Sequence, residues 1–83
     1  MKMIQLYIQH SCPFCRNVLR AVDEMGLTED IHYNVIDAAP GTAGVETVLK
    51  IGGKRMVPFL TDGATAMYES GDIISYLKKH GRN

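Results

Sequence analysis

A proline between two cysteines decides where the first helix of this chain can begin. Cys12, Pro13 and Cys15 follow directly after an apolar run, Met3–Ile8, which has the length and alternation of a mostly buried strand. Proline is tolerated in the first turn of a helix, because its missing N–H would be unpaired there anyway. The pattern therefore predicts a strand that leads into a helix starting at Pro13, with Cys12 at or next to its N-cap.

Apolar spacing and turn residues predict five further elements. They are a strand at Ile31–Ile36, a short helix capped by Thr42 and stopped by Gly52 and Gly53, strands at Val57–Thr61 and Thr65–Tyr68, and a last helix capped by Ser70. A helical crossover implies parallel pairing of the first two strands, whereas Asp62-Gly63 predicts an antiparallel hairpin between the last two. The order β-α-β-α-β-β-α predicts an α/β fold, a four-stranded mixed sheet with flanking helices, in one domain over residues 1–83.

Charge and composition narrow the class of function. Nine basic residues balance nine acidic ones, so no strong field favours nucleic acid or an acidic lipid surface as a partner. No apolar stretch reaches the roughly 18 to 20 residues of a membrane span, and no leader pattern follows Met1, so we expect a cytoplasmic protein with no membrane partner. In a reducing cytosol, a single cysteine pair favours transient redox chemistry over a structural disulfide.

The predicted helix start gives the two cysteines different roles. Unpaired backbone N–H groups and the positive end of the helix dipole favour thiolate over thiol, so Cys12 is the predicted nucleophile. Cys15 lies one turn along the same face, close enough to attack a mixed disulfide formed at Cys12. Cys15 is therefore the predicted resolving thiol.

Two other interpretations of the cysteine pair remain open. One is the coincidence of two small apolar residues, which leaves the preceding strand and the proline between them unexplained. The other is half of a zinc site, for which His10, His32 and His80 are the available histidines. Sequence spacing does not bring all of these histidines to the cysteines, so we predict a redox dithiol and no metal.

With Val57-Pro58 opening the predicted hairpin, nearly the whole chain resembles glutaredoxin, a member of the thioredoxin-fold superfamily. The resemblance implies a thioredoxin-like fold in a single glutaredoxin-like domain. It also implies that the bond before Pro58 is cis, that this proline faces the active site, and that the backbone of Val57 pairs with the cysteinyl part of glutathione. Phe14, where many members have tyrosine, is expected to belong to the same site.

A second segment, Tyr68–Ile73, resembles the region that receives the γ-glutamyl end of glutathione in glutaredoxins and in the N-terminal domain of glutathione transferases. Its Glu69-Ser70 pair looks like the transferase version. A carboxylate docks naturally on the N–H groups of Ser70 and Gly71 at a helix start, and Asp72 or Glu69 can pair with the ligand's ammonium. Ser70 as a plain cap and Asp72 as a plain partner of the helix dipole is the simpler interpretation, and both can hold.

Five positions depart from the usual glutaredoxin pattern. Gln9 stands where many members have lysine, Phe14 where they have tyrosine, Met56 where they have threonine, and Tyr68-Glu69 where they have two glycines. The glycine carboxylate of glutathione then needs another cation. Lys54, four residues before Pro58, matches a basic position of the family, with Arg55 beside it, and we assign Lys54 to the predicted site.

The predicted function is a glutathione-dependent thiol–disulfide oxidoreductase that reduces disulfide-bearing or glutathionylated proteins, with a role in electron transport and cell redox homeostasis. Glutathione is its co-substrate, no tightly bound cofactor is expected, and we expect a monomer. The alternatives are an iron–sulfur cluster carrier that uses Cys12 plus glutathione, a thioredoxin-like reductant independent of glutathione, and a glutathione-binding adaptor resembling half of a transferase.

Overall fold

The structure is a computed structural model that describes residues 4–81, so Met3 of the first predicted strand lies outside the described part. Its elements are β1 (Ile4–Ile8), α1 (Pro13–Glu24), β2 (Tyr33–Asp37), α2 (Ala43–Gly52), β3 (Phe59–Asp62), β4 (Thr65–Met67) and α3 (Ser70–His80). The predicted element order is confirmed. Among the described helices, none has the length and apolarity needed to cross a membrane.

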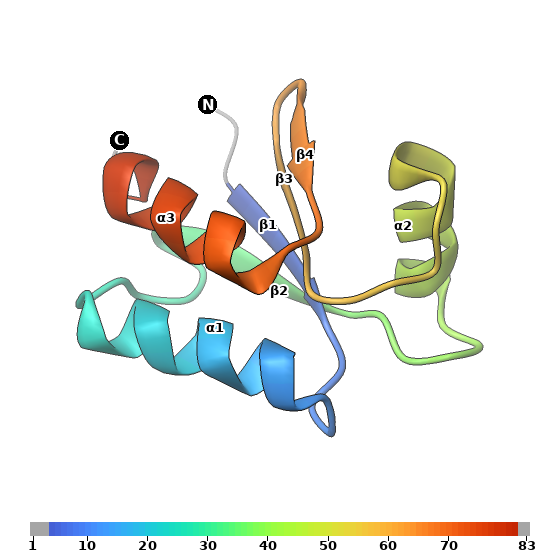
Figure 1. Cartoon of the computed structure of the whole chain (residues 1–83), viewed down its shortest axis with the longest axis horizontal. Helices are drawn as coiled ribbons and strands as arrows, with labels where there is room; N and C mark the ends of the chain where they lie inside the picture. Colours follow the sequence, from blue (N-terminus) through green and yellow to red (C-terminus); the bar gives the residue numbers. More distant parts are fainter. Residues whose placement is uncertain (1–3, 82–83) are drawn as a thin grey trace.

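The four strands form one mixed sheet in the order β2-β1-β3-β4. β1 runs parallel to β2 and antiparallel to β3, and β3 and β4 form the predicted hairpin. Helices α1 and α3 cover one face of the sheet, and α2 covers the other (Figure 1). The predicted α/β fold with a mixed sheet and flanking helices is therefore confirmed.

Alternate residues of β1 supply the two cores on either side of the sheet. Ile4, Leu6 and Ile8 belong to the core under α1 and α3, whereas Tyr7 belongs to the core under α2. All four side chains are buried, because successive residues of a strand point to opposite faces and both faces are covered by helices. Val57, which precedes β3, packs against both cores and so lies at their junction.

One of the two predicted side-chain caps is present. The hydroxyl of Thr42 accepts a hydrogen bond from the backbone N–H of Val45 at 3.2 Å, which confirms Thr42 as the N-cap of α2. The prediction for Ser70 is wrong: Glu69 is the N-cap of α3, its side chain makes no cap hydrogen bond, and Ser70 is the first helical residue. The N–H groups at the start of α3 therefore lack a side-chain cap.

The predicted strand limits are wrong at both ends of β2 and β3 and at the end of β4, with β2 ending at Asp37 and β3 at Asp62. Ile31 is 68 % exposed, and β2 begins only at Tyr33, since the ladder follows the length of β1 rather than the run of β-branched residues. β3 begins at Phe59 instead of Val57, because Pro58 has no N–H to donate to a ladder. β4 ends at Met67, one residue before Tyr68.

Gly44 lowers the helix propensity of α2 but allows this helix to pack closely against the end of β2. A Cβ at this position would lie 2.0 Å from the carbonyl oxygen of Asp37 and 3.1 Å from Cγ2 of Ile36. The glycine therefore allows α2 to approach the end of β2 closely, and this packing offsets the low helix propensity of glycine.

We expect Gly44→Ala to lower the free energy of unfolding by about 1 to 3 kcal/mol, because the added methyl group forces α2 away from Asp37. Gly71→Ala is the matched control, since a Cβ at this helical glycine meets no atom within 4 Å. We expect the control to stay within about 1 kcal/mol of the unmodified protein, on the stabilising side. Urea unfolding measures both; equal stability of the two variants would show that the close approach at Gly44 is unimportant.

Candidate active site

Cys12 is held at the start of α1 by backbone hydrogen bonds on both sides. Its N–H donates to the carbonyl of Gln9 at 2.9 Å, and its carbonyl accepts the first helical hydrogen bond from Arg16 at 3.1 Å. Its backbone is extended (φ −83°, ψ 123°), with Pro13 as the first helical residue. The prediction of Cys12 at the N-cap is confirmed, and its half-buried thiol lies at the positive end of the helix.

The environment of Cys12 favours the thiolate. Partial burial by itself raises the pKa of this thiol, but the backbone N–H and the thiol of Cys15, together with the N–H of Phe14, stabilise the negative charge. These interactions outweigh burial, so the pKa of Cys12 lies below the ordinary value of 9.0. The protein therefore holds a larger fraction of Cys12 as thiolate at neutral pH than an unperturbed cysteine has.

Cys15 has the opposite character, although it lies only one helical turn away. Its side chain is fully buried in the core under α1 and α3. Burial raises its pKa to about 11, and the nearby Cys12 sulfur adds to the rise, whereas the N–H of Gln9, 3.4 Å from the sulfur, opposes it. Cys15 is therefore kept as a neutral thiol beside the more acidic Cys12.

A cavity of about 170 Å³ lies where the segment before β3 faces the start of α3. Its lining residues are Phe14, Met56, Val57, Pro58, Tyr68, Glu69 and Ser70. Five of these seven belong to the predicted glutathione site, from parts of the chain far apart in sequence. The other predicted site residues, Cys12, Cys15, Lys54, Gly71 and Asp72, do not line this cavity.

Val57 and Pro58 form one wall of the cavity. The bond between them is cis, as the family resemblance implies, and Pro58 is buried. The ladder between β1 and β3 ends at Tyr7 opposite Phe59, so the strand direction carries Val57 toward the end of β1 from which the chain leads to Cys12. Val57 is held there by its packing against both cores.

The start of α3 forms the facing wall. Glu69 is exposed at the N-cap, Ser70 is half-buried, and Gly71 and Asp72 are exposed in the first turn. Open space surrounds the position where a Cβ of Gly71 would lie. The exposed carboxylates of Glu69 and Asp72 therefore lie at the positive end of the α3 dipole, where the N–H groups have no side-chain cap.

The two cations near the site differ in what holds them. The Arg55 guanidinium pairs with the carboxylate of Glu46 at 3.2 Å, while the Lys54 ammonium forms no salt bridge within residues 4–81. The backbone of Lys54 is bound instead to the hydroxyl of Tyr68. Of the two, Lys54 is the cation whose charge remains available.

Sequence reasoning assigned no ligand role to Met56, which it noted as a departure from the family pattern, or to Tyr68, which it noted as a departure at the start of the second resembling segment, yet both line the cavity. Met56 is 48 % exposed and Phe14 is 61 % exposed, so these two give the cavity an apolar rim. The one sequence feature related to the position of Tyr68 is Gly52, whose missing side chain leaves room for the tyrosine ring. The two residues are too far apart in sequence for a local pattern to connect them.

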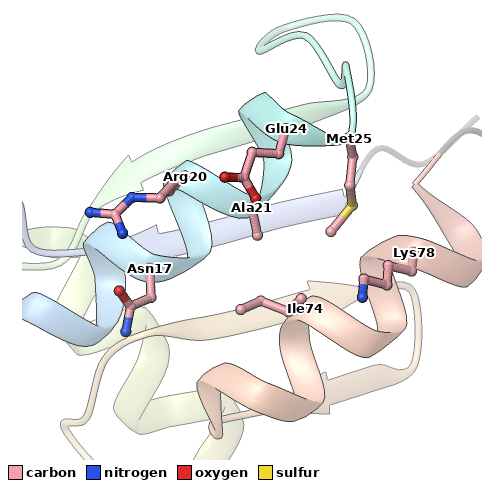
Figure 2. A pocket seen from close by; sticks show the side chains of 7 residues that line it. All are labelled: Asn17, Arg20, Ala21, Glu24, Met25, Ile74 and Lys78. Atoms are coloured by element: carbon pink, nitrogen blue, oxygen red, sulfur yellow. The ribbon is translucent and has the colours of Figure 1, made fainter.

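A second, larger cavity lies outside this site. It has a volume of about 490 Å³ and lies between α1 and α3, where Arg20, Glu24 and Lys78 surround it (Figure 2). None of the predicted site residues line it.

Within residues 4–81 no three histidine, cysteine or acidic side chains form a group that could hold a metal ion. The zinc interpretation therefore finds no support in the described part of the chain.

Known structures share this fold. A glutathione transferase homologue from Drosophila mojavensis, solved with bound glutathione, matches all of this chain at 26 % identity and a TM-score of 0.77, with 37 % of its own length covered. Glutathione transferase Omega 3C from Trametes versicolor matches 92 % of this chain at 25 % identity and a TM-score of 0.76, with 32 % of its length covered. This chain therefore spans about a third of the length of these two transferases.

A glutaredoxin from Archaeoglobus fulgidus matches all of this chain at 23 % identity and a TM-score of 0.72, with 89 % of its own length covered, which shows the shared fold. The predicted thioredoxin-like fold is thus confirmed. Residues 6–82 match the glutathione S-transferase N-terminal domain as a family. The chain therefore belongs to the glutathione S-transferase N-terminal domain family, within the thioredoxin-fold superfamily.

Proposed function

We propose that this protein is a glutathione-dependent thiol–disulfide oxidoreductase that acts on disulfide-bearing or glutathionylated proteins through Cys12. The observation that carries the proposal is the contrast between two thiols one turn apart. Cys12 is half-buried with a lowered pKa, and Cys15 is fully buried with a pKa of about 11. A nucleophile held as thiolate beside a protonated second thiol suits disulfide exchange.

The reaction proceeds in two exchange steps. In the first, the Cys12 thiolate attacks the glutathione sulfur of a protein–glutathione disulfide, so that a Cys12–glutathione disulfide forms and the protein leaves as a thiolate that takes a proton from water. In the second, the thiolate of a free glutathione attacks the glutathione sulfur on Cys12. This restores the Cys12 thiolate and releases glutathione disulfide, so that one free glutathione is oxidised for each target thiol that is reduced.

Free glutathione, rather than Cys15, is the better agent for the second step. Burial raises the pKa of Cys15 to about 11, so only a small fraction of this thiol is ionised at pH 7, and the thiolate is the attacking species. Forming the Cys12 mixed disulfide removes the repulsion from the Cys12 sulfur but leaves burial, the largest cause of the shift. Cys15 therefore serves mainly to stabilise the Cys12 thiolate and resolves the mixed disulfide slowly.

The cavity offers a seat for the glutathione moiety. The backbone of Val57 lies beside it, Ser70 and Gly71 present N–H groups to the γ-glutamyl carboxylate, and Glu69 or Asp72 can pair with the ammonium. At about 170 Å³ the cavity is smaller than typical ligand clefts of roughly 300 to 1,000 Å³, so part of the tripeptide lies along the surface. Lys54 is the cation proposed for the glycine carboxylate.

The family match favours a second candidate, conjugation of glutathione to an electrophile. That reaction needs the glutathione site but no cysteine pair. The buried Cys15 beside Cys12 is the feature that favours disulfide exchange over conjugation.

Cysteine variants test the proposed reaction on a glutathionylated peptide with excess glutathione. We expect Cys12→Ser to reduce the rate to the uncatalysed background, because no other nucleophile is available at the helix start. Cys15→Ser is expected to keep at least a third of the activity, because glutathione performs the second step. Catalysis by Cys12→Ser would overturn the assignment. A parallel assay with a chlorinated nitroarene as electrophile tests conjugation, whose rate should stay at background for the unmodified protein.

The rate of alkylation by iodoacetamide measures the ionisation of Cys12. A lowered pKa means that the thiolate persists to lower pH, so the rate should rise with a midpoint below 9.0 and level off above it. Cys15→Ala removes the thiol that stabilises the charge, and we expect its midpoint at higher pH. A midpoint at or above 9.0 in the unmodified protein would contradict the proposed activation.

A further inference from the structure

Tyr68 binds both backbone groups of a single residue in the loop between α2 and β3. Its hydroxyl accepts a hydrogen bond from the N–H of Lys54 at 3.0 Å and donates one to the carbonyl of the same residue at 2.8 Å. Lys54 lies outside any helix or strand, where backbone groups have no regular partner. One side chain thus fixes the backbone of Lys54 in position and direction.

The ring of Tyr68 fits between its neighbours without steric overlap. It packs on Phe59 with 4.6 Å between the ring centroids, and Phe59 is fully buried. At the hydroxyl end of the ring, a Cβ at Gly52 would lie 2.2 Å from the Tyr68 hydroxyl and 2.6 Å from Cζ. Gly52 therefore leaves the space that the hydroxyl needs to reach Lys54.

The same tyrosine lines the cavity between Val57-Pro58 and Glu69-Ser70. The hydrogen bonds of Tyr68 therefore tie Lys54 directly to a wall of the proposed ligand site. Val57 does not depend on this tie, because it packs against both cores and is followed by a buried proline. Of the residues proposed for the ligand, Lys54 is the one that Tyr68 controls.

The neighbouring ion pair is a weak substitute for this tie. Arg55 and Glu46 are 57 % and 58 % exposed, and an exposed pair of this kind contributes little to holding a loop. The pair also occupies the guanidinium of Arg55. The Tyr68 hydroxyl is thus the main polar restraint on where the Lys54 side chain begins.

We propose that Tyr68 is a positioning residue that holds Lys54 where its ammonium meets the glycine carboxylate of bound glutathione. The inference rests on the proposed function, because it concerns how the proposed glutathione site holds the backbone of Lys54, its cation, in one place. Tyr68 acts here through Lys54 and takes no part in the exchange at Cys12.

The test uses the reduced protein and S-methylglutathione, whose blocked thiol cannot undergo exchange, with affinities measured by calorimetry. A second probe is the same compound with its glycine carboxylate converted to an amide. We expect Tyr68→Phe to weaken binding of the acid about fivefold, the upper range for one exposed ion pair, and to change binding of the amide less than twofold. Gly52→Ala, which displaces the hydroxyl from the other side, should have the same effect.

Tyr76→Phe is the matched control. Its hydroxyl also joins residues fourteen positions apart, donating to Asp62 at 2.5 Å, but it lies outside the cavity. We expect this variant to bind both probes as the unmodified protein does, even if thermal unfolding shows a comparable loss of stability. Equal weakening of acid and amide, or no weakening by Tyr68→Phe, would overturn the role of Tyr68 and leave the proposed function standing. Failure of the unmodified protein to bind the acid would overturn both.

Discussion

The burial of β1 on both faces is the constraint on which the rest of the structure depends. β1 is flanked by β2 and β3, and its alternate side chains fill two cores, one under α1 and α3 and the other under α2. A strand enclosed in this way has little freedom to shift, since a slip of one residue would exchange its two faces. After the end of β1, the chain reaches Cys12 through a short turn closed by the hydrogen bond from the Cys12 N–H to the Gln9 carbonyl. The position of the Cys12 thiol at the start of α1 is therefore fixed by the sheet.

The same constraint separates two chemically identical side chains. Cys12, at the helix start, meets N–H groups that stabilise a negative charge, while Cys15 points into the core that β1 helps to build. Burial then keeps Cys15 neutral, and its thiol serves as a donor to its neighbour. The division of roles that we propose follows from this difference in environment: exchange takes place at the accessible sulfur, and free glutathione is favoured over the buried sulfur for its recovery.

Four of the five departures from the glutaredoxin pattern line the cavity, namely Phe14, Met56, Tyr68 and Glu69. Tyr68 stands where a small residue is usual, and the space for its ring is provided by Gly52 and the face of Phe59. Its hydroxyl holds the Lys54 backbone, and Lys54 is the cation that we propose in place of the lysine missing at Gln9. Tyr68 thus connects Phe59, Gly52 and Lys54 in one arrangement, although it is separated from all three along the chain.

The sequence by itself determined the features that depend on neighbours along the chain. Pro13 marked the start of α1, Thr42 capped α2, and the spacing of Cys12 and Cys15 placed both thiols on one helical turn. The start of β2 was mispredicted at Ile31, because a strand extends only as far as its partner allows, and a partner is not a local property. The start of β3 was mispredicted at Val57, because Pro58 has no N–H to donate to the ladder. Family resemblance, rather than residue spacing, anticipated that Val57-Pro58 and Glu69-Ser70 share a site. Only the tertiary structure decided that Tyr68 meets Lys54 and that Arg55 is paired with Glu46, since such contacts arise from packing between distant segments and leave no periodic signal in the sequence.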